Sequence, residues 1–145
     1  MRAARQRFGA TLVPTDAGGV RRLVAALKDN QLVGILPDQD PGPLAGEFAP
    51  FFGVAANTMT LFTRLAQKTG APALLCHAQR LPHGRGFDIW MQPMSATLAA
   101  ADMQVALTAL NNAVAALAQQ QPEQYQWVYR RFRTRPPGVD MLYRG

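Results

Sequence analysis

Along this chain, short continuous apolar runs alternate with longer segments whose apolar residues recur at helical spacing. The strongest helical signal lies at about 102–120, in the steps of four, three, four and three that separate Met103, Leu107, Leu110, Val114 and Leu117. Two further helices are predicted at about 17–29, capped by Thr15 or Asp16, and at about 57–69. An α/β fold follows, because chains that alternate in this way build a sheet covered by helices.

The expected strands are short and lie between these helices. Residues 10–14 and 32–36 are predicted as strands, the second of them buried on both faces because it is apolar throughout. Residues 72–79 are predicted as a further buried strand, and the segment 81–86 as a hairpin turn that leads into a return strand at 87–91. The prediction is therefore a mostly parallel sheet with flanking helices and one antiparallel hairpin.

The composition fits one packed domain and excludes several classes of protein. Of the 145 residues, 48% are hydrophobic and 17% are charged, which argues against disorder, collagen and coiled coil. The single cysteine, Cys76, excludes a disulfide framework within the chain, and its apolar neighbours predict a buried thiol. His77, on the same expected strand, is predicted to be a histidine of the core.

The net charge of +6 comes from arginines near the two ends of the chain. Residues 1–9 hold three arginines and no acid, and residues 130–145 hold five arginines and one aspartate. Of the 15 basic residues, 13 are arginine, whose planar guanidinium matches phosphate oxygens better than the lysine ammonium does. We therefore expect a phosphate-rich partner: a nucleic acid, an anionic membrane surface or a phosphorylated substrate.

Two aspartates follow the expected strand 32–36, in the proline-bounded loop 37–43. Open α/β sheets bind ligands at the carboxyl ends of their strands, and Asp38 and Asp40 project to the same side if this segment is extended. The pair is therefore a candidate ligand site. The alternative is a turn in which the aspartates accept hydrogen bonds from nearby backbone amides, and the pattern by itself favours neither.

A second candidate is the segment 122–136, in which three aromatic residues in five positions precede four arginines in six. A nucleic-acid interface would stack bases on Tyr125 or Trp127 and bind phosphates through the arginines. A membrane interface would place the same aromatic residues and arginines at the level of the headgroups. The third interpretation is a solvated basic tail whose aromatic side chains pack on the core.

Four segments carry a resemblance to a known family. They are GILPDQD at 34–40, FAPFFG at 48–53, LAQKTGA at 65–71 and PEQYQWVYRRFRTRP at 122–136. Together they resemble the C-terminal half of the bacterial lipid A biosynthesis acyltransferases, the lauroyl/myristoyl transferase group of the lysophospholipid acyltransferase-like superfamily. Tyr129 departs from the histidine that is usual in this family, and Arg133 from the usual lysine.

The resemblance implies transfer of a fatty acyl chain from acyl carrier protein to a hydroxyl of a phosphorylated, glucosamine-based lipid A precursor. In such a reaction a histidine base deprotonates the hydroxyl, and a cationic site stabilises the oxyanion and the phosphates. No metal and no tightly bound cofactor is implied, since the acyl-acyl carrier protein is a co-substrate. The expected place of action is the cytoplasmic face of the bacterial inner membrane. An anionic membrane surface is expected as a partner, and a nucleic acid is not.

The resemblance also assigns expected roles to residues of this chain. Asp38 is expected to be a supporting catalytic residue, with Arg7 as its ion-pair partner. The expected substrate-binding residues are Asp40, Arg7, Arg21, Arg130, Arg131, Arg133 and Arg135.

In the family, an N-terminal membrane anchor and a catalytic His-x4-Asp/Glu motif precede the segments matched here. Residues 1–145 are therefore expected to be the C-terminal portion of a single acyltransferase domain, which starts within the fold and is inactive alone. His83 and Asp88 have the spacing of the motif, but they lie on the expected hairpin with no helix after them, so we interpret the match as chance. The alternative function is a non-catalytic, Arg-rich module that binds anionic lipid or nucleic acid.

Overall fold

The computed structural model describes residues 6–143, which belong to two compact units. The first unit ends at Gly34 and the second begins at Ile35. Of the arginines near the chain ends, Arg2, Arg5 and Arg144 lie outside the described residues.

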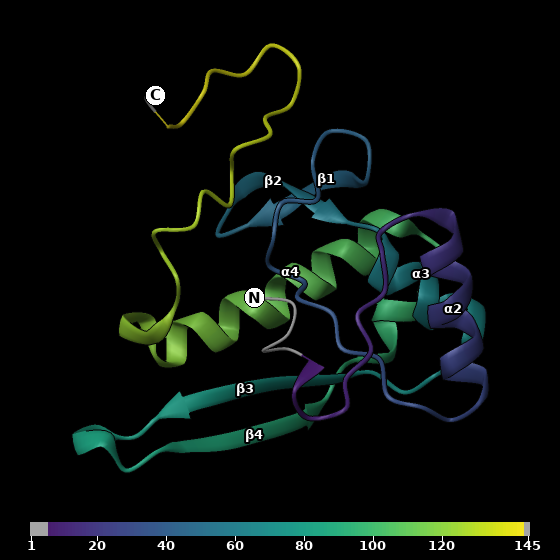
Figure 1. The fold of residues 1–145 in the computed structure, drawn as a ribbon. Helices are drawn as coiled ribbons and strands as arrows, with labels where there is room; N and C mark the ends of the chain where they lie inside the picture. Colours follow the sequence, from purple (N-terminus) through teal and green to yellow (C-terminus); the bar gives the residue numbers. More distant parts are fainter. Residues whose placement is uncertain (1–5, 144–145) are drawn as a thin grey trace. The chain divides into compact units, whose positions relative to one another are not determined.

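The first unit contains the helix α2 (Ala17–Lys28; Figure 1). Its N-cap is Asp16, whose carboxylate accepts a 2.7 Å hydrogen bond from the amide of Gly19. Gly19 is also a point of close approach, because a Cβ there would collide with the carbonyl oxygen of Pro14. The predicted helix and its aspartate cap are confirmed. The predicted strand at 10–14 is wrong, since these residues have no regular secondary structure.

The second unit opens with a β-hairpin that the sequence did not predict. Strand β1 (Gly46–Phe51) pairs antiparallel with β2 (Val54–Met59). Phe52 and Gly53 form the two-residue turn with φ of 50° and 77°, and positive φ at both positions matches the twist of the flanking strands. The predicted helix at 57–69 is therefore wrong at its start, because residues 57–59 belong to β2.

Two helices follow this hairpin in the chain, and the second of them packs on its strands. Helix α3 (Leu61–Thr69) ends at Gly70, which has a φ of 67° as the left-handed C-cap requires. Helix α4 (Met103–Gln120) follows the N-cap Asp102 and packs on β1, with Leu107 and Leu110 fully buried (Figure 1). Helix α3 packs instead on α4 and on the 3₁₀ turn η2 (Ala96–Ala99). The predicted helix at 102–120 and its apolar face are thus confirmed.

The one hairpin that the sequence predicted is also present, as the second hairpin of this unit. Strand β3 (Leu74–Arg80) pairs antiparallel with β4 (Phe87–Pro93), and the short 3₁₀ turn η1 (Pro82–Gly84) forms its tip. Two further 3₁₀ turns, η2 (Ala96–Ala99) and η3 (Pro122–Gln124), flank helix α4 in the chain. In Figure 1 the hairpin is a two-stranded ribbon that extends away from the β1–β2 sheet of the same unit.

The class α/β agrees with the structure, but the mostly parallel sheet is wrong. Both sheets in the described part of the chain have two strands, and both pairings are antiparallel. Residues 32–36 form no strand, and Leu32 and Leu36 are 91% and 54% exposed. Parallel strands need hydrogen-bonding neighbours and a covering layer on each face, and residues 32–36 have no pairing strand among residues 6–143. An apolar run predicts burial only when such neighbours are present.

Strand β3 also differs from the buried strand that was predicted. Only Leu75 of its residues is buried, whereas Cys76 is exposed and His77 is half-buried. The expectations of a buried thiol and a core histidine are therefore wrong. The reason is the same as for residues 32–36: no third strand pairs with this ribbon in the described part of the chain.

Candidate functional site

Asp40 is the buried carboxylate of the loop 37–43 and the centre of a hydrogen-bond network. Its Oδ1 accepts hydrogen bonds from the amide of Gly42 at 2.8 Å, from Asn57 Nδ2 at 3.1 Å and from Thr134 Oγ1 at 3.1 Å. Its Oδ2 accepts a bond from the amide of Thr134 at 2.8 Å. With 7% of its surface exposed, Asp40 has its carboxylate held by protein donors on both oxygens.

These bonds also set the ionisation state of Asp40. Burial by itself raises the pKa of the carboxyl, whereas the hydrogen bonds from Gly42, Thr134 and Asn57 favour the anion. The hydrogen bonds outweigh the burial, and the pKa lies below its ordinary value of 3.8. Asp40 is therefore an anion near neutral pH, and its bonds to Thr134 are the charge-assisted kind.

The network joins two segments that are far apart in the sequence. Besides Thr134, Tyr129 reaches the loop, because its hydroxyl oxygen accepts a 2.8 Å hydrogen bond from the amide of Asp40. Asn57, on β2, also donates to the carbonyl oxygen of Gly42 at 2.7 Å. The loop 37–43 is thus fastened to both β2 and the segment 129–134. A histidine ring nitrogen is an acceptor like the Tyr129 hydroxyl, which gives a physical account of the tyrosine at this position.

Arg131 is the buried cation of the same network, with 3% of its surface exposed. Its Nη1 donates to the carbonyl oxygen of Asn57 at 2.7 Å, and its Nη2 to Thr58 Oγ1 at 3.0 Å and Asn111 Oδ1 at 3.4 Å. Its guanidinium carbon lies 5.5 Å from the ring centroid of Phe51. Burial lowers the pKa of Arg131, and the nearby Tyr125, Asp40, Asp38 and Tyr129 act in the opposite direction. Arg131 therefore fastens the C-terminal segment to β2 and α4.

The seven residues that make these bonds are called the Asp40–Arg131 network below. They are Asp40, Asn57, Thr58, Asn111, Tyr129, Arg131 and Thr134. Sequence reasoning named Asp40 and Arg131 but missed the partners of both. Asn57, Thr58 and Asn111 are nearly fully buried, and polar residues inside otherwise apolar segments are the signal by which they could have been found.

Asp38 differs from Asp40 although they are two residues apart. It is half-buried, and within residues 6–143 its carboxylate accepts no hydrogen bond. Its charge acts on Tyr125 nevertheless: burial and then Asp38 raise the pKa of that phenol to about 12. Asp38 is thus a loop carboxylate to which no residue in the range 6–143 donates a hydrogen bond, and its supporting catalytic role stays a prediction.

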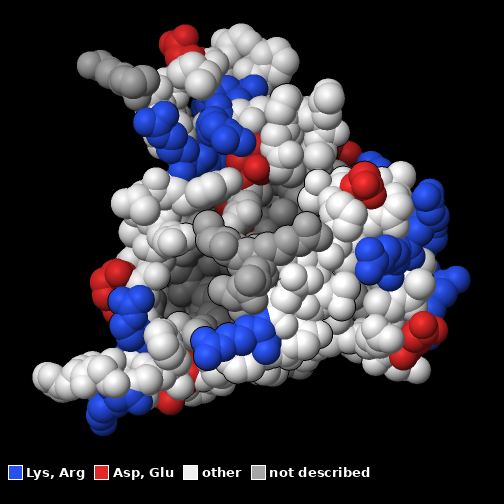
Figure 2. Space-filling view, in the orientation of Figure 1, with Lys and Arg blue, Asp and Glu red and all other residues white. Residues whose placement is uncertain are grey.

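The remaining arginines that were expected to bind substrate fall into two groups. Arg130 and Arg133 are exposed, and Figure 2 shows Lys and Arg side chains gathered over the C-terminal segment. Arg135 is half-buried and donates to the carbonyl oxygens of Ala55 at 3.2 Å and Asp140 at 3.3 Å. In the first unit, Arg7 and Arg21 are exposed. Their substrate contacts, and the Asp38–Arg7 pair, stay predictions.

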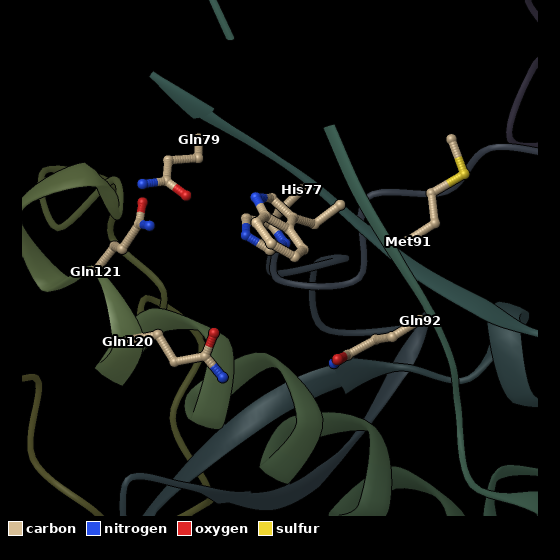
Figure 3. A pocket seen from close by; sticks show the side chains of 7 residues that line it. His77, Gln79, Met91, Gln92, Gln120 and Gln121 are labelled. Atoms are coloured by element: carbon tan, nitrogen blue, oxygen red, sulfur yellow. The ribbon is translucent and has the colours of Figure 1, made fainter. Parts of the chain in front are cut away.

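A second group of polar side chains lines an open groove of about 370 Å³ along the hairpin β3–β4. His77 and Trp90 stack in it with ring centroids 6.4 Å apart and an angle of 11°. In Figure 3 the hairpin amides Gln79 and Gln92 lie across from Gln120 and Gln121. The groove offers neutral hydrogen-bond donors and acceptors and no carboxylate, so it lacks the parts of an acid–base pair.

The His-x4-Asp spacing in the hairpin also does not form such a pair. His83 lies in the turn η1 with a φ of 57°, and Asp88 lies on β4; both side chains are exposed. No hydrogen bond joins these two residues, which are both among the described ones, and no helix follows them directly. The geometry agrees with the interpretation of a chance match.

No helix in the described part of the chain is long and apolar enough to cross a membrane. Within the same residues, no three His, Cys, Asp or Glu side chains are grouped so that they could hold a metal ion.

Known proteins match this chain over most of its length. The model of the bacterial lipid A biosynthesis acyltransferase family matches residues 1–134. The chain is 34% identical over 129 residues to the lipid A biosynthesis lauroyltransferase of Escherichia coli (strain K12), which is 88% of the chain and 42% of that relative. It is 34% identical over 125 residues to the palmitoleoyltransferase of the same strain, which is 86% of the chain and 40% of the relative.

The lipid A biosynthesis myristoyltransferase of the same strain is 28% identical over 147 aligned positions, covering 97% of the chain and 43% of the relative. The chain thus spans about two-fifths of the length of the curated relatives it matches. The matched range includes both the loop of Asp40 and the residues 129–134 that bind it. On this evidence the chain belongs to the bacterial lipid A biosynthesis acyltransferases, a family of enzymes.

Proposed function

We propose that the protein acts in lipid A biosynthesis by moving a fatty acyl chain from acyl carrier protein to a hydroxyl of a phosphorylated, glucosamine-based lipid A precursor. The family match over residues 1–134 and the names of the relatives support this proposal. In the reaction, a base accepts the proton of the hydroxyl, its oxygen attacks the thioester carbonyl, and the thiolate of the carrier leaves. The acyl-acyl carrier protein is a co-substrate, and no bound cofactor takes part.

The observation that carries the proposal is the bonding of two family segments to each other. The DQD loop at 38–40 and the RRFRTRP run at 130–136 are separate in the sequence, and Asp40 and Thr134 join them through two hydrogen bonds. The loop is thus held at Asp40, and Asp38, two residues before it, is half-buried. We infer that the network positions Asp38 beside the reacting hydroxyl, where its charge orients a cationic group or the hydroxyl itself.

The exposed arginines supply the second part of the proposal. Arg130 and Arg133 are exposed and available to anions, whereas Arg131 is buried and its Nη1 and Nη2 donate to protein oxygens. Phosphates of the lipid A precursor, anionic headgroups at the cytoplasmic face of the inner membrane and acidic residues of acyl carrier protein are the anions that this reaction brings to the protein. We propose that Arg130 and Arg133 bind these groups.

A chimera tests the proposed activity. In the E. coli lauroyltransferase, the part aligned with this chain is replaced by the corresponding residues of this chain, and the chimera is expressed in a strain that lacks the lauroyltransferase. We expect mass spectra of lipid A to show one added acyl chain. A folded chimera that restores no acylation, while the unmodified lauroyltransferase does, would contradict the proposal.

The 145-residue chain alone is expected to transfer no acyl group from acyl carrier protein. The reason is that its one His-x4-Asp match, at His83 and Asp88, lies exposed on a hairpin and forms no acid–base pair. Purified chain is incubated with acyl-acyl carrier protein and a lipid A precursor. Turnover that disappears in His83→Ala would overturn this expectation and assign catalysis to the hairpin.

The alternative function is an Arg-rich module that binds anionic lipid or nucleic acid without catalysis. The 145-residue chain and the chimera together distinguish it from the acyltransferase. It predicts tight binding of the 145-residue chain to RNA or to anionic vesicles together with an inactive chimera. Binding that falls steeply with salt in wild type and is lost in Arg130→Gln/Arg133→Gln would support it.

A further inference from the structure

The hairpin β3–β4 has two different faces. Side chains alternate along each strand, and the register pairs Cys76 with Met91 and Ala78 with Ile89. One face of the ribbon is the groove of His77 and Trp90. The other face, called the apolar hairpin face below, consists of Leu74, Cys76, Ala78, Phe87, Ile89 and Met91.

The apolar hairpin face is open to solvent. Phe87, Ile89 and Met91 are 57%, 61% and 66% exposed, and Leu74, Cys76 and Ala78 are exposed as well. The face carries no acid, and the cation at its end, Arg80, lies 6.0 Å from the ring centroid of Phe87. Six adjacent apolar side chains in water are unfavourable, because burying each large one contributes about 1.5–3 kcal/mol.

The outer edge of β4 is open too. The outer edge of β3 is covered at its end, where the amide of Arg80 donates to Gln124 Oε1 at 2.7 Å and its carbonyl oxygen accepts from Gln124 Nε2 at 3.3 Å. No such partner meets the outer edge of β4 among residues 6–143. A two-stranded ribbon by itself is marginally stable, and an open edge is a template for a further strand.

The size and the open edge together limit what can cover this face. A ribbon of two seven-residue strands is about 23 Å long and about 10 Å wide, which gives about 230 Å². A stable dimer buries about 800 Å² per partner, so a second copy would need much more surface than this. A bilayer would bury the apolar side chains but would leave the backbone groups of the β4 edge without hydrogen bonds, which costs several kcal/mol for each group. A polypeptide that adds a strand would both bury the apolar side chains of the face and form hydrogen bonds with the backbone groups of the β4 edge.

The relatives contain a candidate for such a polypeptide, because they are longer than this chain. The chain spans about two-fifths of the proteins it matches, so each of them has a larger part outside the match. We propose that the apolar hairpin face and the outer edge of β4 form the surface on which this other part of the acyltransferase packs. It adds at least one strand to β4 and covers Ile89 and Met91 with apolar side chains. This inference rests on the family and not on the proposed reaction.

Cys76 reports on this surface directly, because it is the single cysteine of the chain and lies in the face. The rate of its reaction with a thiol reagent is measured in the 145-residue chain and in the lauroyltransferase chimera, with all other cysteines of the chimera replaced by serine. We expect fast labelling in the chain and labelling at least ten times slower in the folded chimera. Equal rates would overturn the proposal.

A matched control reports on the opposite face of the ribbon. In Cys76→Ala/Gln79→Cys, the thiol lies in the groove and not on the apolar hairpin face. Slower labelling at position 76 than at position 79 in the chimera supports coverage of the apolar face. Protection of Cys76 in the 145-residue chain by anionic vesicles, or by raising the chain concentration, would instead assign the face to a membrane or to a second copy.

A second measurement needs no chimera. Ile89→Thr in the 145-residue chain is expected to leave the melting temperature unchanged, because Ile89 has no covering layer there. A decrease of more than about 5 °C would show that the face is packed inside the chain, and it would overturn the proposal. Since both readouts are independent of turnover, an inactive chimera with a protected Cys76 rejects the proposed function and retains this surface.

Discussion

The Asp40–Arg131 network and the hairpin β3–β4 differ in where their side chains find partners. In the network, every buried side-chain donor and acceptor except Arg131 Nε finds a partner among the described residues, over sequence separations of 89 residues for Asp40 and Tyr129 and 94 for Asp40 and Thr134. In the hairpin, local pairing satisfies the backbone, and the apolar side chains stay exposed. The difference is that, among residues 6–143, the polar groups around Asp40 bond to distant segments, whereas no third strand pairs with β4.

The largest effect on stability is expected from removing the buried cation of the network. Arg131→Leu removes the donors to the carbonyl oxygen of Asn57, to Thr58 Oγ1 and to Asn111 Oδ1, although Thr58 and Asn111 still bond to each other. We expect a loss of about 3 kcal/mol or more in the free energy of unfolding, because a hydrogen bond to a charged group contributes about 1.5–3 kcal/mol and Arg131 donates several. Urea denaturation of the 145-residue chain measures it. The exposed neighbour gives the control: Arg130→Leu should change stability by less than about 0.5 kcal/mol.

The two aspartates of the loop are expected to separate catalysis from stability. Asp38→Asn in the chimera should lower acyl transfer by about 10²–10³ and change the melting temperature little, because the Asp38 carboxylate makes no described hydrogen bond. Asp40→Asn should lower the free energy of unfolding by about 1–3 kcal/mol, because it weakens the bonds from Thr134. If instead Asp38→Asn lowers the melting temperature and leaves turnover intact, Asp38 is a residue of the turn and not of the site.

The lowered pKa of Asp40 predicts how stability depends on pH. The carboxyl binds its proton more weakly in the folded chain, so the unfolded chain carries more protons at acid pH. The stabilisation by Asp40 is therefore fully present above its ordinary pKa of 3.8 and is lost as the pH falls through the lower pKa of the folded state. Unfolding curves at a series of pH values should show a steeper acid loss in wild type than in Asp40→Asn. Parallel curves would contradict the assignment.

The smallest expected effect concerns Tyr129. Tyr129→Phe removes the acceptor of the Asp40 amide and should cost about 1 kcal/mol, the usual net worth of a hydrogen bond. Tyr129→His restores an acceptor, and we expect it to lie between wild type and Tyr129→Phe in thermal denaturation. A histidine variant less stable than the phenylalanine variant would show that the ring nitrogen does not reach this amide.

Local patterns predicted two helices and one hairpin well, and α3 in part. Helix α4 follows from the steps of three and four, and in the structure Asp102 caps it, while Gly70 in the left-handed conformation ends α3. The hairpin β3–β4 follows from a Gly-rich turn between two runs. The hairpin β1–β2 was not predicted, because its turn has Phe52 where asparagine or glycine is the usual signal.

The sequence by itself determined the family of this protein and the helices α2 and α4, and it pointed to the loop at 38–40 and the run at 130–136, which the structure joins. These are properties of neighbouring residues, of spacing and of motifs. Only the tertiary structure decided that Asp40 and Arg131 are buried in one network while Asp38 is half-buried and Arg130 and Arg133 are exposed. It likewise decided that Cys76 and Ile89 lie in the open. The reason is that burial depends on which distant segments pack against a side chain, and a pattern along one segment does not contain that information.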